Sequence, residues 1–321
     1  MQRIAVLDGW RGISILMVLS AHLLPLGPSS MHLNETFARM GMAVFFSLSG
    51  FLITSLLIVN SDIKSFLIKR FARILPLAWL TLIVTLPLYD ASFYDYLSNL
   101  LFFSTATPMT LFPATSHFWS LCVEMQFYVF IALLVWTFGK KALYLLPLLC
   151  VAITANRVIN EVPYAINTYY RVDEILIGAT LALGYHHYKR FIPKFSVFST
   201  LTLLIALGLA SYPKLEIFNY FRPYVCAFML ATTLNSDSDS ITFKILTNRI
   251  LVYIATISFA LYVIHGGLRY TWLGSGDTLQ KYLKRPVLLL ATFVMAHFST
   301  FYYESYFQKK VKKYSIRKGQ K

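Results

Sequence analysis

The sequence predicts an all-α protein, a polytopic membrane bundle of about ten transmembrane helices. Hydrophobic residues make up 57% of its 321 residues and charged residues only 13%, whereas an ordinary soluble domain carries about 25% charged residues. The apolar residues are also gathered into long runs, and a helix needs about 20 mostly apolar residues to cross a bilayer. The expected spans are residues 12–27, 42–60, 71–88, 118–138, 142–156, 172–188, 195–211, 223–236, 250–268 and 286–305.

In chain order, the first apolar run is interpreted as a retained helix, because no small-residue cleavage site of a signal peptide follows it. The fifth and eighth spans are short for a crossing. Residues 89–117 form the longest loop, and its apolar piece from Leu97 to Phe103 is too short to span, so it is expected to be re-entrant or interfacial. We expect one transmembrane domain over residues 1–308 and a basic cytoplasmic tail over residues 309–321.

The distribution of basic residues predicts the orientation. With a cytoplasmic N-terminus, 20 of the 29 Lys and Arg fall inside and nine outside, so both termini are expected to be cytoplasmic. The net charge of +15 follows this topological pattern and suits anionic membrane lipids, so no nucleic acid is expected as a partner. The outer loop 269–285, with four basic residues, is the exception.

The three cysteines, Cys122, Cys150 and Cys226, lie inside apolar segments without metal-ligand spacing. They are interpreted as small core residues, and neither a disulfide framework nor a metal site is predicted.

Two ionisable residues, Arg11 and His22, lie in the apolar stretch from Leu7 to Leu24. Eleven residues along a helix correspond to about 20° of rotation and about 16 Å of rise, so both would share one face. Arg11 then stands at the cytoplasmic end and His22 within the outer half of the membrane. An ionisable group at that depth is expensive and points to function. The alternative is a histidine that hydrogen-bonds a neighbouring helix for packing.

A basic cluster is predicted at the cytoplasmic level. Arg70 and Arg73 are three residues apart and share a helix face, and with Lys69 they would lie beside Arg11. Because arginine forks match phosphate oxygens, the cluster suits a phosphorylated ligand. The alternative is ordinary positive-inside charge. Glu304 is expected at the same level, where it could pair with an arginine.

A second set of polar residues is predicted at the outer level. Glu124 lies inside the fourth span, and a Glu124–His22 pair would raise the basicity of the imidazole, as a general base needs. Tyr262 and His265 share a face of the ninth span with Ser258, although an interfacial aromatic belt would explain them as well. His117, Trp119 and Ser120 complete this level. Arg171 and Asp173 could form a structural pair, and Ser47 and Gly50 are expected to allow close helix approach.

Six stretches together carry a family resemblance. They are LDGWRGISILMVLSAH, FFSLSGFLIT, KRFARILPLAW, HFWSLCVEMQFYVF, RVDEILIGATLA and SFALYVIHG, in this order between residues 7 and about 266. The chain resembles the membrane-bound acyltransferase-3 family, the bacterial integral-membrane O-acyltransferases. The resemblance implies a ten-helix core, acyl-CoA as donor, an essential pair in Arg11 and His22, and CoA phosphates held by Arg70 and Arg73.

Two positions depart from the family pattern. Met125 stands where members often have a second acidic residue after Glu124, and no proline follows Glu304. Some members also carry a periplasmic transferase domain. Because this sequence stops after its tenth predicted span, we expect it to act alone or with a separate partner.

These observations predict a multi-pass O-acyltransferase of the bacterial inner membrane. It would move an acyl group, acetyl being the commoner family choice, from cytoplasmic acyl-CoA to a hydroxyl of a surface polysaccharide or lipid-linked glycan. His22, Arg11 and Glu124 are the expected catalytic residues, Arg70, Arg73 and Lys69 the donor-binding residues, and Trp119, Tyr262 and His265 the acceptor-binding residues. Direct transfer and an acyl-histidine intermediate both stay open. A transporter or flippase for a glycan or acyl carrier is the main alternative, and a scaffold for glycan assembly is a third.

Overall fold

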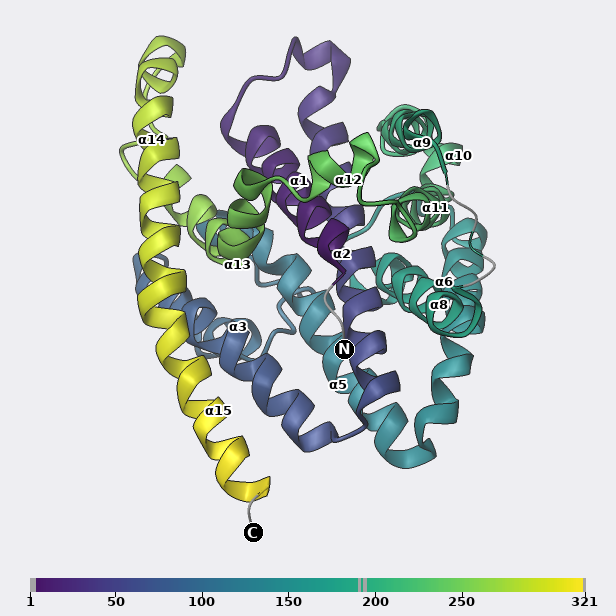
Figure 1. Ribbon diagram of the computed structural model, residues 1–321. Helices are drawn as coiled ribbons and strands as arrows, with labels where there is room; N and C mark the ends of the chain where they lie inside the picture. Colours follow the sequence, from purple (N-terminus) through teal and green to yellow (C-terminus); the bar gives the residue numbers. More distant parts are fainter. Residues whose placement is uncertain (1–3, 190–191, 193–194, 320–321) are drawn as a thin grey trace. The chain divides into compact units, whose positions relative to one another are not determined.

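The computed structural model describes residues 4–189, 192 and 195–319, and over these ranges the chain is helical and contains no β-strand (Figure 1). The all-α prediction is therefore confirmed. The chain divides into two compact units, each discontinuous in sequence. The first comprises the residues up to 60 and residues 134–256, and the second comprises residues 61–133 and those from 257 onward.

Seven helices in the described part of the chain are long and apolar enough to cross a membrane. They are Ala5–Leu23, Leu33–Val59, Ile63–Leu88, Pro113–Phe138, Lys140–Ile159, Arg249–Arg269 and Thr278–Lys313. Each coincides with one of the predicted spans. The expected count of about ten is not confirmed, and the cytoplasmic placement of both termini stays a prediction, as does the boundary between a domain and a tail at residue 308.

The other three predicted spans are helices, but they are short. α8 (Asp173–Tyr188) has 16 residues, whereas α9 (Val197–Leu209) and α11 (Arg222–Leu234) have 13 each. At 1.5 Å per residue they reach only about 20–24 Å, less than the roughly 30 Å of a hydrocarbon core. Charged residues begin both α8 and α11, and these residues take part in a buried ion network.

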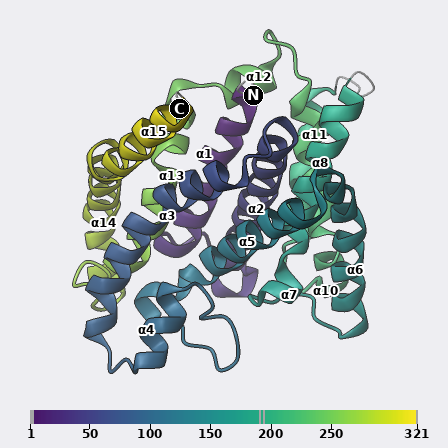
Figure 2. The ribbon, with the colours of Figure 1, turned by 90° about the horizontal axis from the view of Figure 1, so that it is seen from below.

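The first unit is built around α2, which packs against α1, α8, α9 and α11. Helices α6, α8 and α11 lie together on one side of α2, and α12 lies near α1 (Figure 2). Besides α8, α9 and α11, the helices are α1 (Ala5–Leu23), α2 (Leu33–Val59), α6 (Leu146–Ile159), α7 (Thr168–Arg171), α10 (Glu216–Asn219), α12 (Ile241–Leu246) and the beginning of α13 (Arg249–Arg269).

Glycines allow α2 and α8 to cross at very short range. A Cβ atom on Gly50 would clash with the carbonyl group of Ile175, and one on Gly178 would clash with that of Ser47. The Ser47 hydroxyl donates a hydrogen bond to the Glu174 carbonyl oxygen at 3.1 Å. The interpretation of Ser47 and Gly50 as small residues that let helices approach is confirmed.

Five charged side chains are buried together where α6, α8 and α11 meet. Arg157 Nη1 lies 2.5 Å from Asp173 Oδ2, and Glu174 binds both Arg222, at 2.6 Å, and Arg171, at 3.2 Å. All five side chains are at most 1% exposed. Burial lowers the pKa of Arg171 to about 10 while Glu174 acts to raise it, so this guanidinium stays charged at neutral pH. Asp173 and Arg171 thus have partners other than the expected ones.

The second unit contains two departures from regular helix that lie against each other. α3 (Ile63–Thr85) contains Pro76, and α14 (Thr278–Phe298) passes through a π-helix (Ser299–Glu304) into α15 (Ser305–Gly319). The Tyr303 hydroxyl donates to the Pro76 carbonyl oxygen at 3.2 Å, and α3 packs along the π-helix and α15. π-Helical turns are often found at functional sites.

The long loop between α3 and α5 (Trp119–Phe138) carries one further helix, α4 (Phe93–Leu100). A capping box formed by Ser92 and Asp95 begins α4, and the Asn99 amide donates to the Thr110 carbonyl oxygen at 2.8 Å. The apolar piece Leu97–Phe103 thus begins within α4 and continues beyond the end of this helix at Leu100. Its interfacial or re-entrant position stays a prediction.

Replacing Glu174 with glutamine is expected to destabilise the first unit, because Arg171 and Arg222 would lose the carboxylate that they share. Removing one partner of a buried ion pair lowers the free energy of unfolding by about 3–5 kcal/mol. The measurement is the midpoint of thermal unfolding of the detergent-purified chain. Glu216→Gln, at an exposed position of α10, is the control and should leave the midpoint unchanged. Equal midpoints for the two variants would mean that the network does not stabilise the fold.

Candidate functional site

Arg11 and His22 lie on one uninterrupted helix, α1, as their spacing predicts. Both residues are partly buried. Arg11 Nη1 lies 3.8 Å from Asp8 Oδ1, one turn earlier on the same helix, and this carboxylate favours one orientation of the guanidinium. α1 therefore presents a cation near its beginning and an imidazole in its last turn.

Glu124 in the second unit is connected to α3 through Tyr128. The buried Glu124 carboxylate accepts a hydrogen bond from the Tyr128 hydroxyl, and the Arg70 guanidinium carbon lies 5.8 Å from the centre of the Tyr128 ring. Tyr128 follows Glu124 by four residues on α5, the spacing at which side chains meet on a helix. The carboxylate of Glu124 thus belongs to the same neighbourhood as the arginine pair of α3.

α3 also carries the three basic residues of the predicted donor cluster. Arg70 and Arg73 are partly buried, whereas Lys69 is exposed. Glu304 accepts hydrogen bonds from the hydroxyls of Ser299 and Thr300, at 3.1 and 3.3 Å, and Arg73 attracts this carboxylate electrostatically. Arg73 is therefore an electrostatic partner of Glu304, whereas the two hydroxyl groups are its hydrogen-bond partners.

A second buried polar cluster joins α13 to the segment before α5. The Tyr262 hydroxyl lies 2.6 Å from Ser120 Oγ and donates to the His117 carbonyl oxygen. The rings of His117 and His265 have centroids 4.8 Å apart, and His265 Nδ1 lies 2.7 Å from the Tyr262 carbonyl oxygen. Tyr262, His265 and Ser120, predicted at the outer level, are thus brought together, and Trp119 directly precedes Ser120.

A glycine sets the position of the His117 ring. A Cβ atom on Gly266 would clash with the imidazole of His117, whereas one on the next residue, Gly267, would meet open space. His117 Nε2 lies 3.2 Å from the Val263 carbonyl oxygen. The imidazole is therefore held against the backbone of α13.

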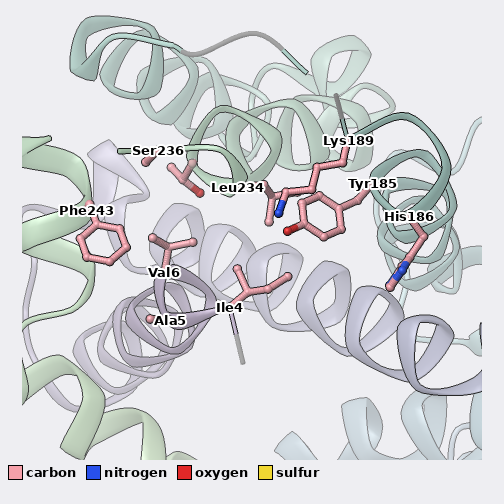
Figure 3. Close-up of a pocket in the computed structure, with 10 residues that line it drawn as sticks. Ile4, Ala5, Val6, Tyr185, His186, Lys189, Leu234, Ser236 and Phe243 are labelled. Carbon is pink, nitrogen blue, oxygen red and sulfur yellow. The ribbon is translucent and has the colours of Figure 1, made fainter. Parts of the chain in front are cut away.

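The first unit contains a pocket of about 470 Å³ that begins at the first turn of α1 (Figure 3). Tyr185, His186 and Lys189 from the end of α8 form one side, and Phe243 lies across the pocket from them. Lys189 Nζ lies 5.2 Å from the centre of the Tyr185 ring. The full lining is Ile4, Ala5, Val6, Tyr185, His186, Lys189, Thr233, Leu234, Ser236 and Phe243. A cation, hydroxyl groups and aromatic rings around one space suit a phosphorylated aromatic ligand.

The predicted site residues divide between the two units. Arg11 and His22 belong to the first, and the other seven belong to the second. The proximity of Arg11 to the basic face of α3, and that of His22 to Glu124, both stay predictions.

Sequence reasoning gave no role to several residues of these clusters. Tyr128 could have been found, because it lies four residues after Glu124 within an apolar helix. His117 is expected at the outer level, but only the folded chain reveals the contact of its ring with the tilted ring of His265. Nothing in the local sequence of Arg157 and Arg222 indicates that these two arginines are buried.

The described residues include the kinds of chemical group that acyl transfer requires. An imidazole can act as general base, arginine and lysine side chains can hold phosphates, and hydroxyl groups can donate to a developing oxyanion.

Comparison with known proteins points to the same chemistry. The chain is 30% identical over 218 residues to "Putative peptidoglycan O-acetyltransferase YrhL" of Bacillus subtilis, covering 55% of this chain and 32% of that protein. It is 26% identical to "Putative O-acetyltransferase SACOL0978" of Staphylococcus aureus, covering 83% and 50% of the two chains. With the peptidoglycan O-acetyltransferase OatA of Listeria monocytogenes the identity is 26%, covering 91% and 54%.

The chain spans a third to about half of the length of these curated relatives. No solved structure matches it. A model of the acyltransferase domain family matches residues 4–305, which is nearly the whole sequence. With its apolar helices the chain is a multi-pass membrane protein, and it belongs to this acyltransferase family.

Proposed function

We propose that this chain is an O-acyltransferase of the bacterial inner membrane. It moves an acyl group, acetyl in the simplest case, from cytoplasmic acyl-CoA to a hydroxyl of a surface polysaccharide or lipid-linked glycan. The observation that carries the proposal is the placement of Arg11 and His22 on one continuous helix, α1, in a member of the acyltransferase family. The names of the relatives, which refer to O-acetyl transfer and to peptidoglycan, support a glycan acceptor.

The donor is assigned to the end of α1 that carries Arg11. The pocket of Figure 3 begins at residues 4–6, and Arg11 follows little more than one helical turn later. Lys189 and the Ser236 hydroxyl would bind phosphates there, and Tyr185 or Phe243 would stack on the adenine ring. In the second unit, further N–H groups that could donate hydrogen bonds to phosphate oxygens belong to Arg70, Arg73 and Lys69. Glu124, through Tyr128, positions the guanidinium of Arg70.

The transfer step assigned to His22 is general-base catalysis. Its imidazole takes the proton of the acceptor hydroxyl, and the oxygen attacks the carbonyl carbon of the thioester. The new C–O bond forms, the C–S bond breaks, and the CoA thiolate leaves and takes up the proton from the imidazolium. The hydroxyls of Ser120 and Tyr262, together with Trp119 and His265, are assigned to the acceptor.

The first test is transfer of labelled acetyl groups from acetyl-CoA to surface glycan in membranes that contain the full chain. His22→Ala and Arg11→Ala should abolish the base-labile label, since general-base catalysis contributes about 10²–10⁴-fold. His187→Ala and Arg249→Ala, which change the same residue types elsewhere, should keep it. Label that persists in His22→Ala would remove this residue as the essential base. A parent chain that transfers no label to any glycan would contradict the proposal.

Gly266→Ala tests the assignment of the second cluster to the acceptor. The added methyl group must displace the His117 ring, and a displacement of about 1 Å can cost as much as 100-fold in rate. We expect at least about a tenfold loss of transfer, with a raised KM for the acceptor. Gly184→Ala is the control, because a Cβ atom there meets open space, and it should retain parent activity. Full activity of Gly266→Ala would exclude the His117 cluster from the reaction.

A further inference from the structure

An apolar groove of about 580 Å³ lies in the second unit between α3, α13 and α14. Its lining includes Leu80, Val84, Leu268 and Met295. Hydroxyl groups also occur in the lining, but those of Thr81, Thr85 and Thr271 donate to backbone carbonyl oxygens of their own segments. These hydroxyl protons are therefore already engaged, and a hydrocarbon ligand would meet few uncompensated polar atoms.

The groove is open along its side. Val84 is 60% exposed and Leu88 is 76% exposed, and across the groove Tyr302 on the π-helix is 66% exposed. In a chain that crosses a bilayer, apolar side chains exposed on spanning helices face lipid. A ligand would accordingly enter from the membrane rather than from water.

Basic and aromatic residues gather where the groove ends. Thr271 lines the groove, and the carbonyl oxygen of the next residue, Trp272, accepts a hydrogen bond from Lys284 Nζ at 3.0 Å. On α14, Lys284 precedes Met295 by eleven residues, so both lie within about 20° of one face. Arg285 lies 4.1 Å from the centre of the Tyr282 ring.

One donor in this group has no protein acceptor. Arg285 Nη1 is buried and, within the described part of the chain, makes no hydrogen bond. Buried donors normally have partners, so an unsatisfied guanidinium nitrogen indicates a missing acceptor. Arg285 also belongs to the segment 269–285, the predicted exception to the positive-inside pattern, and three of the four basic residues of this segment lie on the first turns of α14.

We propose that this groove binds the hydrocarbon chain of a single-chain lipid phosphate, with the phosphate held by Lys284 and Arg285. The groove is open along its side, so it accommodates part of one long chain while the rest stays in the bilayer. A phosphomonoester also carries more negative charge toward the basic residues than the phosphodiester of a phospholipid. This inference rests on the proposed function, because a glycan carried on a polyprenyl phosphate would be the lipid-linked acceptor on the outer side.

The experiment is native mass spectrometry of the detergent-purified full chain titrated with decaprenyl phosphate, decaprenol or a phosphatidylglycerol. Each basic residue near a membrane surface contributes roughly 1 kcal/mol toward an anionic lipid, so decaprenyl phosphate should bind at least about tenfold more tightly than decaprenol. It should also bind more tightly than phosphatidylglycerol. Equal affinities for the phosphate and the alcohol, or a tighter phosphatidylglycerol, would overturn the proposal.

Matched variants locate the binding. Val84→Trp fills the groove and should weaken decaprenyl phosphate about tenfold, whereas Ile83→Trp, on the neighbouring and equally exposed position of α3, should not. The double variant Lys284→Gln/Arg285→Gln should remove the preference for the phosphate over the alcohol, whereas Lys309→Gln/Lys310→Gln should retain it. Unchanged binding in Val84→Trp would overturn the assignment to this groove.

Binding is measured without an acyl donor, so the two proposals fail separately. A chain that binds decaprenyl phosphate in the groove but transfers no acetyl group contradicts the proposed function alone. A chain that acetylates glycan but does not discriminate between decaprenyl phosphate and decaprenol contradicts only the lipid site.

Discussion

A charge buried among apolar helices must find a partner, and this requirement organises the first unit. Three arginines and two carboxylates are almost completely removed from solvent where α6, α8 and α11 meet. An isolated charge in such surroundings would be very unfavourable, so each helix must keep the register that preserves the pairs. Asp173 and Arg222 are the first residues of α8 and α11. The network therefore also explains why these two helices begin where they do.

The second unit meets the same requirement mainly with hydroxyl groups. Glu124 accepts from Tyr128, Glu304 from Ser299 and Thr300, and Ser120 bonds with Tyr262. Arginines lie close to both carboxylates, since Arg73 attracts Glu304 and Tyr128 connects Glu124 with Arg70. A ligand phosphate that binds these arginines would compete with the carboxylates for them. This arrangement suits reversible binding better than a network of tight ion pairs.

Membership in the acyltransferase family and the geometry of α1 support each other, but they answer different questions. The family relationship identifies the class of reaction that related proteins are named for. The structure places Arg11 and His22 on one continuous helix, α1. Rigid elements hold reactive groups more accurately than loops do. The pocket beside the first turn of α1 and the groove beside α14 belong to separate units, so each can be tested by itself.

The sequence by itself determined the class of fold and the positions of the long spans. Runs of about 20 apolar residues predict helices regardless of context, because a bilayer requires every backbone polar group to be paired within its own segment. The spacing of Arg11 and His22, the small residues of α2 and the pair of arginines on α3 were also predictable, since each depends only on helical periodicity.

Tertiary structure alone decided the lengths of α8, α9 and α11 and the partners of the polar residues. Apolar composition predicted crossings there, but α8 and α11 begin at charges whose partners come from distant segments. Asp173 pairs with Arg157 on α6, and Glu124 is linked to Arg70 through Tyr128. Local sequence cannot specify such pairs, because the free energy of a buried polar group depends on which side chains the fold places beside it.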